Sequence, residues 1–447
     1  MTPVAASQSE APRRPKPSAL ARPKARPVCY TDEWRRTQPD FAVYLPPKPL
    51  QRDGYNDHFL VDVTPGGDLL AMWTQATYEG ARDLHVVFSR SSDGGQSWSQ
   101  PQEMAGAEEG PGMVSTFGFP VISRKGRIYC FFNKHLMATD GGSYITGIMR
   151  CKYSDDDGRT WKTGVDIRQR RTRFDHPDPN VGCKTIVWQK PIRDAKDRVI
   201  VGFSRWSSLQ VFPRPVGGNR NHLDTQCELM RFDNIDESPA PKDIQITWLP
   251  REEGTIRVPP PIEPERSKGY SLAEEPGIVL LPDGRLFMTM RTVTGRIWYT
   301  VSEDDGASWR TPEILRYRDG GRQVEHPKSP PPLYRLSNGR YLLFFHNHDG
   351  HQYGATGPWD MDARRPLFLT VGEFRPKAHQ PLWFSAPKLF CDTQGVGVGQ
   401  ENLFWLAMYA SLTERGGQRI FWYPDRKHFL LGRTITDEFL ADRVVPA

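Results

Sequence analysis

The chain has 447 residues and a formal net charge of +6. The positive excess lies mainly in a basic, Pro-rich stretch within the first thirty residues, and the remainder is close to charge balance, so we expect no nucleic-acid partner. No apolar run is long enough to cross a bilayer, so we expect no membrane-spanning segment either.

Residues 1–45 are predicted to form a basic N-terminal arm and lead-in, and residues 46–447 a single repeat domain. The arm has the composition of a disordered segment. The N-terminus lacks the apolar core of a signal peptide, so we expect a cytoplasmic protein or one whose targeting segment lies outside this sequence. Scattered cysteines favour free buried thiols, although Cys130 and Cys151 lie in strand-like runs that could face each other.

An eight-residue pattern, Ser-x-Asp-x-Gly-x-x-Trp, follows an alternating apolar run at three places in the chain. The copies are Ser91–Trp98, Ser154–Trp161 and Ser302–Trp309. Ser and Asp side chains bond to nearby backbone N–H groups, Gly adopts a positive φ and Trp packs back onto the sheet, so each copy predicts a turn between strands. Three copies at strand ends indicate a repeat architecture.

Strand-like runs also recur along the chain, and most follow a polar turn that contains glycine. They are residues 68–73, 127–132, 198–203, 285–290, 340–345 and 418–423. Together with 39 Gly and 40 Pro, they are typical of an all-β protein with many turns. The spacing predicts a six-bladed β-propeller of four-stranded antiparallel blades. Long connections at one mouth of its channel would wall a site, and the candidates are 165–185, 206–226, 250–273 and 346–366.

The repeated turn resembles the Asp-box, or BNR repeat, of sialidases and related six-bladed propellers, over most of the chain. Further residues match that family in order. Asp83 resembles its acid/base aspartate. Glu275 and Tyr409 resemble the pair in which a glutamate polarises a nucleophilic tyrosine. Arg291 and Arg365 resemble two arginines that grip the substrate carboxylate.

This resemblance implies an exo-acting glycoside hydrolase that removes a terminal acidic sugar from a glycan and needs no metal or cofactor. A sialoside carries a carboxylate on its anomeric carbon, and planar guanidinium groups bind such an anion in a bidentate manner. A carboxylate nucleophile would be repelled there, so a neutral tyrosine attacks instead. A neighbouring glutamate takes the phenol proton, and a protonated aspartate serves the leaving oxygen.

The sequence departs from the family at the first blade, where a leading arginine is expected and Asn56 stands instead. Arg52 and Arg35 are the alternative sources of that charge. Loss of one bidentate contact removes a strong interaction. We therefore expect Asn56 and His58 to line a remodelled subsite for a different acidic or neutral sugar.

A histidine cluster follows a strongly apolar strand, with His346 and His348 at its start. We favour a substrate-binding or general-base role for one of these side chains over metal binding, because histidine titrates near neutrality.

Two other function classes remain open. A polysaccharide lyase would use a His or Tyr base beside a uronate carboxylate, and Asn56, His58, His85, His346 and His348 suit that chemistry. A non-catalytic glycan-binding propeller is the other class.

Overall fold

The computed structural model describes residues 32–48, 50–106, 114–135, 146–213, 224–261, 269–406 and 408–447. The predicted arm up to residue 31 lies outside the described residues. Helical structure in the described part is limited to one short α-helix and four 3-10 turns: α2 (Asp437–Leu440), η1 (Glu33–Thr37), η4 (Ile235–Glu237), η5 (Pro241–Asp243) and η6 (Met361–Ala363). No helix of the described residues has the length and apolarity that crossing a membrane requires. The predicted all-β class is confirmed.

The strands of the first half of the chain form three successive antiparallel groups. The first is β2 (Tyr55–Val63), β3 (Leu69–Ala76), β4 (His85–Ser91) and β5 (Gln102–Ala105). The second is β6 (Val114–Ile122), β7 (Ile128–His135), β8 (Thr146–Ser154) and β9 (Lys162–Ile167). The third is β10 (Cys183–Ile186), β11 (Ile192–Arg193), β12 (Val199–Trp206), β13 (Thr225–Phe232) and β14 (Ile246–Leu249).

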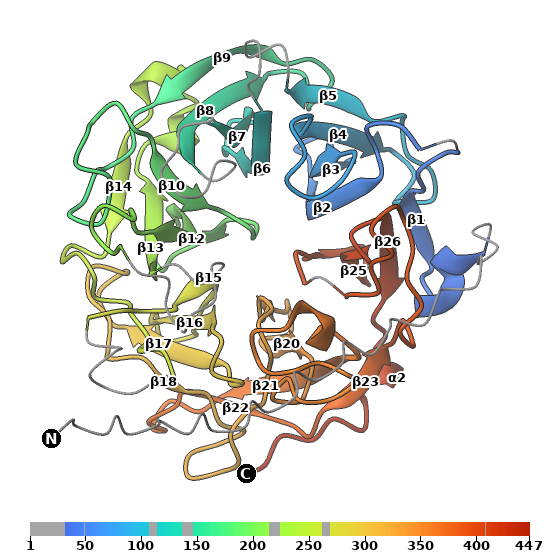
Figure 1. Cartoon of the computed structure of the whole chain (residues 1–447), viewed down its shortest axis with the longest axis vertical. Coiled ribbons are helices and arrows are strands. Elements are labelled where there is room, and N and C mark those ends of the chain that lie inside the picture. Colours follow the sequence, from blue (N-terminus) through green and yellow to red (C-terminus); the bar gives the residue numbers. More distant parts are fainter. Residues whose placement is uncertain are drawn as a thin grey trace, which may run out of the picture.

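Three further groups complete the ring. They are β15 (Glu274–Leu280), β16 (Leu286–Arg291), β17 (Trp298–Ser302) and β18 (Glu313–Ile314); then β19 (Leu333–Arg335), β20 (Tyr341–Phe345), β21 (Leu367–Phe374), β22 (Leu382–Phe384) and β23 (Lys388–Cys391); and finally β24 (Ser411–Arg415), β25 (Gln418–Asp425) and β26 (Phe429–Thr434) with β1 (Phe41–Tyr44). The groups stand around one central axis, as a propeller requires (Figure 1).

Two details of the sheets differ from the sequence-based prediction of six separate four-stranded blades. Strand β10 pairs with both β8 and β12, so the second and third groups share one nine-stranded sheet, and β23 adds a fifth strand beside β21. The predicted boundary at residue 45 is also wrong, because β1 pairs with β26. The N-terminal strand therefore closes the last sheet, which ties the two ends of the described chain together.

Apolar side chains of neighbouring sheets pack against each other and form the core. Phe59 and Trp73 of the first group, for example, contact Trp422 and Leu430 of the last group within one buried cluster. Such burial between sheets is what holds a propeller closed. Five cysteines lie buried as free thiols, as expected: Cys130, Cys151, Cys183, Cys227 and Cys391.

The three Asp-box turns form as predicted. In the third copy, the Ser302 hydroxyl accepts from the Gly306 N–H at 2.9 Å, and the Asp304 carboxylate accepts from the Ser308 N–H at 2.8 Å. Gly306 has a φ of +84°, and the Trp309 indole donates to the Gly306 carbonyl at 3.0 Å. Side chains thus satisfy the backbone of a turn that has no ladder of its own.

Strand register separates the two edges of the ring. Val63 pairs with Leu69, and Leu69 with Ser91, so the first Asp-box lies at the edge where β2 ends. We call this the Asp-box edge. Tyr55 pairs with Ala76 at the opposite edge, where first strands begin and second strands end. We call that the site edge. By the same pairing of strands, it also holds the start of β15, the end of β16 and the segment just before β24.

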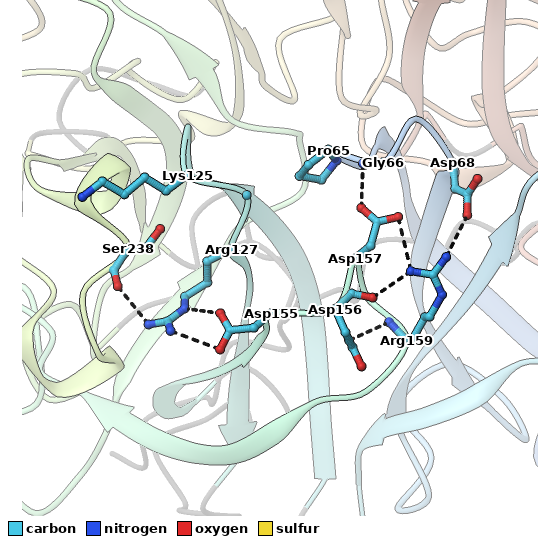
Figure 2. A pocket seen from close by; sticks show the side chains of 11 residues that line it. Pro65, Gly66, Asp68, Lys125, Arg127, Asp155, Asp156, Asp157, Arg159 and Ser238 are labelled. Atoms are coloured by element: carbon cyan, nitrogen blue, oxygen red, sulfur yellow. Dashed lines mark hydrogen bonds and ion pairs between the residues drawn. The ribbon is translucent and has the colours of Figure 1, made fainter.

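Figure 2 shows a pocket at the Asp-box edge, with a volume of about 490 Å³. Its lining is strongly charged, but its carboxylates already have partners. Asp155 pairs with Arg127 at 2.7 Å, and Asp157 accepts from the Thr64 hydroxyl and the Gly66 N–H, both at 2.8 Å. The Asp157 bonds tie the second group to the first, and the Asp155–Arg127 pair joins two turns of the second group, so both have a structural role.

Candidate active site

A buried tyrosine, a glutamate and an arginine meet at the site edge. The Tyr409 hydroxyl donates to Glu275 Oε1 at 2.8 Å and accepts from Arg291 Nη1 at 3.0 Å. Arg291 Nη1 also lies 2.5 Å from Glu275 Oε2. All three side chains are at least 95% buried. The structure thus brings Tyr409 against two predicted site residues that precede it in the chain by 134 and 118 positions.

The local backbone at the start of β15 explains how two consecutive glutamates reach one arginine. The register of β15 against β16 shifts between Glu274 and Gly277, and Glu275 has a φ of +45°. The Glu275 N–H is held by the Ser204 hydroxyl at 2.6 Å. Glu274 Oε2 therefore also reaches Arg291 Nη2, at 2.7 Å. A left-handed glutamate is a strained conformation of the kind that surrounding structure must impose, and it is typical of functional sites.

The environment keeps the Tyr409 phenol protonated. Burial and then the negative charge of Glu275 raise the pKa of Tyr409, and the positive charges of Arg291, Arg364 and Lys427 lower it only in part. The ring lies edge-on to His58, with centroids 4.8 Å apart, and to Trp188 at 6.3 Å. The phenol is therefore a neutral hydroxyl in an aromatic cage, hydrogen-bonded to a carboxylate that can take its proton.

The two adjacent arginines before β21 point to different partners. The predicted residue, Arg365, makes a bidentate ion pair with Asp392 at 2.9 Å, and its guanidinium lies over the Tyr353 ring. Its neighbour Arg364 is completely buried and donates from Nε to the Lys328 carbonyl at 2.8 Å. Arg364 Nη1 and Nη2 have no hydrogen-bond partner among the described residues. Arg364, rather than Arg365, presents an open guanidinium fork to the site.

Asn56 has no capacity left for a substrate. Its amide donates to the Asp53 and His428 carbonyls, and its side-chain oxygen accepts from Trp73 Nε1 and Gln75 Nε2, all at 2.9 Å. Two donors and two acceptors are the full complement of an asparagine side chain. These bonds favour a structural role, in which Asn56 holds the entry of β2, over the predicted contact with substrate.

The two arginines considered as replacements for the leading arginine also lie elsewhere. Arg52 pairs with Glu103 at 3.3 Å, with half of its side chain exposed. Arg35 lies over the Trp34 ring and 3.6 Å from Asp32, and it is more exposed still.

Histidines surround the cluster in neutral form. His346 Nδ1 donates to the Pro366 carbonyl and His348 Nε2 to the Arg365 carbonyl, both at 2.9 Å. Burial lowers the pKa of both imidazoles. These bonds favour a structural role over the general-base role expected for one of them. His346 Nε2 and His58 Nδ1 are both buried without a partner among the described residues. His58 differs in that its ring lies against Tyr409.

Asp83 is bound to a turn rather than to this cluster. Its carboxylate accepts from the Thr77 hydroxyl at 2.5 Å and from the Thr77 N–H at 3.2 Å. Within the described residues no contact joins that carboxylate to Tyr409, Glu275 or Arg291. The placement favours a structural cap for Asp83.

A second charged group beside Tyr409 has no counterpart in the sequence analysis. The buried ammonium of Lys427 lies 5.6 Å from the Tyr409 ring centroid, 3.1 Å from Asp57 Oδ2 and 2.7 Å from Glu79 Oε1. Asp57 Oδ1 is buried without a partner among the described residues. Lys427 sits in the hairpin between β25 and β26 and belongs to no motif, so spacing gave no signal for it.

Known proteins resemble this chain in fold. One similar solved structure is the Hadza microbial sialidase Hz136, at 15% identity and a TM-score of 0.53, with 86% of this chain and 66% of that chain covered. Another is the intramolecular trans-sialidase from Ruminococcus gnavus in complex with oseltamivir carboxylate, at 14% identity and a TM-score of 0.56, with 88% of this chain and 96% of that chain covered. A protein of unknown function from Dyadobacter fermentans is similar too, at 11% identity and a TM-score of 0.55, with 88% of this chain and 96% of that chain covered. The chain thus spans just under two thirds of the Hadza sialidase. At such identities these likenesses concern the fold alone.

The family comparison is more specific. No curated protein matches the sequence. The model of the BNR repeat-like domain matches residues 67–394, which hold all three Asp-box turns. The match spans most of the chain and agrees with the resemblance carried by the repeated turns. The chain belongs to the BNR repeat-like, sialidase-like family of β-propellers.

Proposed function

We propose that this protein is an exo-acting glycoside hydrolase that removes a terminal acidic sugar from a glycan. The observation that supports this most is the Tyr409–Glu275 hydrogen bond of 2.8 Å beside an arginine fork that has no partner among the described residues. The first feature is a nucleophile with its base. The second is a buried cation that lacks an anion, which a substrate carboxylate would supply.

In the proposed reaction, Tyr409 Oη attacks the anomeric carbon while its proton passes to Glu275. The bond to the leaving oxygen breaks, and a carboxylic acid protonates that oxygen. Water then cleaves the glycosyl–tyrosine bond: its hydroxyl joins the anomeric carbon and its proton restores the carboxylic acid, while the Tyr409 oxygen recovers its proton from Glu275. A neutral phenol suits a substrate whose own carboxylate lies next to the reacting carbon, because an anionic nucleophile would be repelled there.

Glu79 is the better candidate for the proton donor than Asp83. Its carboxylate lies 2.7 Å from Lys427, whose ammonium is beside the Tyr409 ring, and one third of its side chain is exposed. Burial acts to raise the pKa of Glu79, but Lys427 and then Arg364 hold it below its ordinary value. Glu79 must therefore gain a proton before the step, which favours turnover at acidic pH.

Elimination next to a uronate is the second candidate, and the unpartnered Nδ1 of His58 favours it. Burial lowers the pKa of this imidazole, so it is a neutral base at neutral pH.

Product analysis separates the two reactions. The protein is incubated with sialosides and with uronate-containing oligosaccharides, and the products are followed by mass spectrometry and ultraviolet absorbance. Hydrolysis predicts a released acidic monosaccharide that has gained one water. An unsaturated uronate would contradict hydrolysis and indicate elimination. Binding without any product would indicate a non-catalytic, glycan-binding propeller.

A further inference from the structure

Two buried lysines stand beside the arginines of the candidate site, and the two differ in their partners. Lys427 is already neutralised, because its ammonium pairs with Asp57 at 3.1 Å and with Glu79 at 2.7 Å. A cation held by two carboxylates has little charge to offer an anionic ligand. Lys427 therefore does not replace the missing leading arginine.

Lys328 is fixed through its backbone and has a free side chain. Its N–H donates to the Pro358 carbonyl at 2.7 Å, and its carbonyl accepts from Arg364 Nε at 2.8 Å. Its exposed fraction is 6%. The ammonium makes no hydrogen bond or ion pair within the part of the chain that the structure describes. A charge on so largely buried a side chain is costly unless an anion accompanies it.

The charged groups that act on Lys328 are those of the candidate site. They are Glu274, Arg291, Arg364 and Glu275. Arg291 is held by both glutamates, at 2.7 Å and 2.5 Å, so it has little charge left to offer. Arg364 and Lys328 are then the two cations of this group that lack an acidic partner.

We infer that Lys328 and Arg364 together form a carboxylate clamp, which selects a sugar that carries a carboxylate. This inference rests on the proposed function and names a specificity-determining residue for it. The ammonium replaces the leading arginine by charge and not by position, since it precedes the fifth group of strands rather than the first.

A lysine gives the clamp a property that an arginine would not. Burial, opposed by Glu274 and reinforced by Arg291 and Arg364, lowers the pKa of Lys328 to about 8. The ammonium is charged below that pH and loses its proton above it. Because a bound carboxylate prefers the charged form, affinity is expected to fall as the pH rises through 8. An arginine stays charged over this whole range.

The test is titration calorimetry of the full chain with N-acetylneuraminic acid, glucuronic acid and galacturonic acid, with glucose as the neutral control, between pH 6.5 and pH 9.5. Wild type is expected to bind an acidic sugar more weakly at the alkaline end. Lys328→Met is expected to bind it about 10-fold more weakly at pH 6.5, without that pH dependence. Lys328→Arg is expected to retain affinity and to lose the pH dependence.

Two further variants distinguish the ways in which this can fail. Lys388→Met, which alters a lysine paired with Asp442 on an outer strand, is the matched control and should behave as wild type. If Arg364→Met abolishes binding while Lys328→Met keeps the wild-type affinity and pH profile, the role of Lys328 is refuted and the proposed function stands. If wild type binds no acidic sugar, both fail.

Discussion

The Tyr409→Phe variant is expected to lose about 1,000-fold or more in turnover of an acidic glycoside while the fold is kept. The change removes only the hydroxyl that donates to Glu275 and accepts from Arg291. The ring contacts with His58 and Trp188 remain. Because the phenol is the proposed nucleophile, no other described group at that position can form the glycosyl–enzyme bond.

A second buried tyrosine provides the control for this variant. Tyr423 lies in β25, and its hydroxyl is hydrogen-bonded to the Thr37 hydroxyl at 2.8 Å. Tyr423→Phe removes a similar hydrogen bond and is expected to leave turnover unchanged. Initial rates with a chromogenic acidic glycoside, together with thermal unfolding of both variants, give the comparison. A Tyr409→Phe protein that is folded and turns over at the wild-type rate would remove tyrosine from the mechanism.

The Arg364→Met variant is expected to weaken binding of an acidic sugar by about 10- to 100-fold without a loss of thermal stability. A charge-assisted hydrogen bond is worth about 1.5–3 kcal/mol, which corresponds to that range of affinity. The outer nitrogens of Arg364 have no partner in the part of the chain that the structure describes, so removal of the buried charge relieves a desolvation cost. The lost bond from Nε to the Lys328 carbonyl offsets that relief in part.

The neighbouring arginine supplies the matched control. Arg365→Met breaks the bidentate ion pair with Asp392 and is expected to lower the melting temperature while binding is unchanged. Calorimetric titration and thermal unfolding are thus expected to give opposite patterns: Arg364→Met loses affinity and keeps stability, and Arg365→Met keeps affinity and loses stability. Equal loss of affinity in both variants, or loss in Arg365→Met alone, would contradict the assignment of the fork to Arg364.

Local sequence patterns were sufficient for the architecture because each Asp-box turn is stabilised by its own residues. Ser302, Asp304 and Trp309 make their bonds within eight positions. The pairing of β1 with β26, which closes the last sheet, was not predicted, because a strand of four residues is too short to show a periodic pattern. The pairing of β10 with two strands is likewise a long-range interaction, which the alternation of apolar and polar residues along one strand cannot predict.

The convergence of predicted residues could be foreseen where a motif fixes the side chain at a strand end, and the orientation of side chains on loops could not. Glu275 and Arg291 flank paired strands, so their convergence followed from the sheet. The choice between Arg364 and Arg365 depends on a connection whose path no spacing encodes. Lys328 belongs to another such connection, and its place beside Arg364 follows only from the fold.

The most direct test of the central claim is a crystal structure of the protein with an acidic monosaccharide bound. The account predicts that the sugar carboxylate lies within hydrogen-bond distance of Arg364 Nη1 and Nη2, with the Lys328 ammonium beside it. The anomeric carbon should face Tyr409 Oη. A sugar bound at the Asp-box edge, or one at the site edge whose carboxylate points away from Arg364, would contradict it.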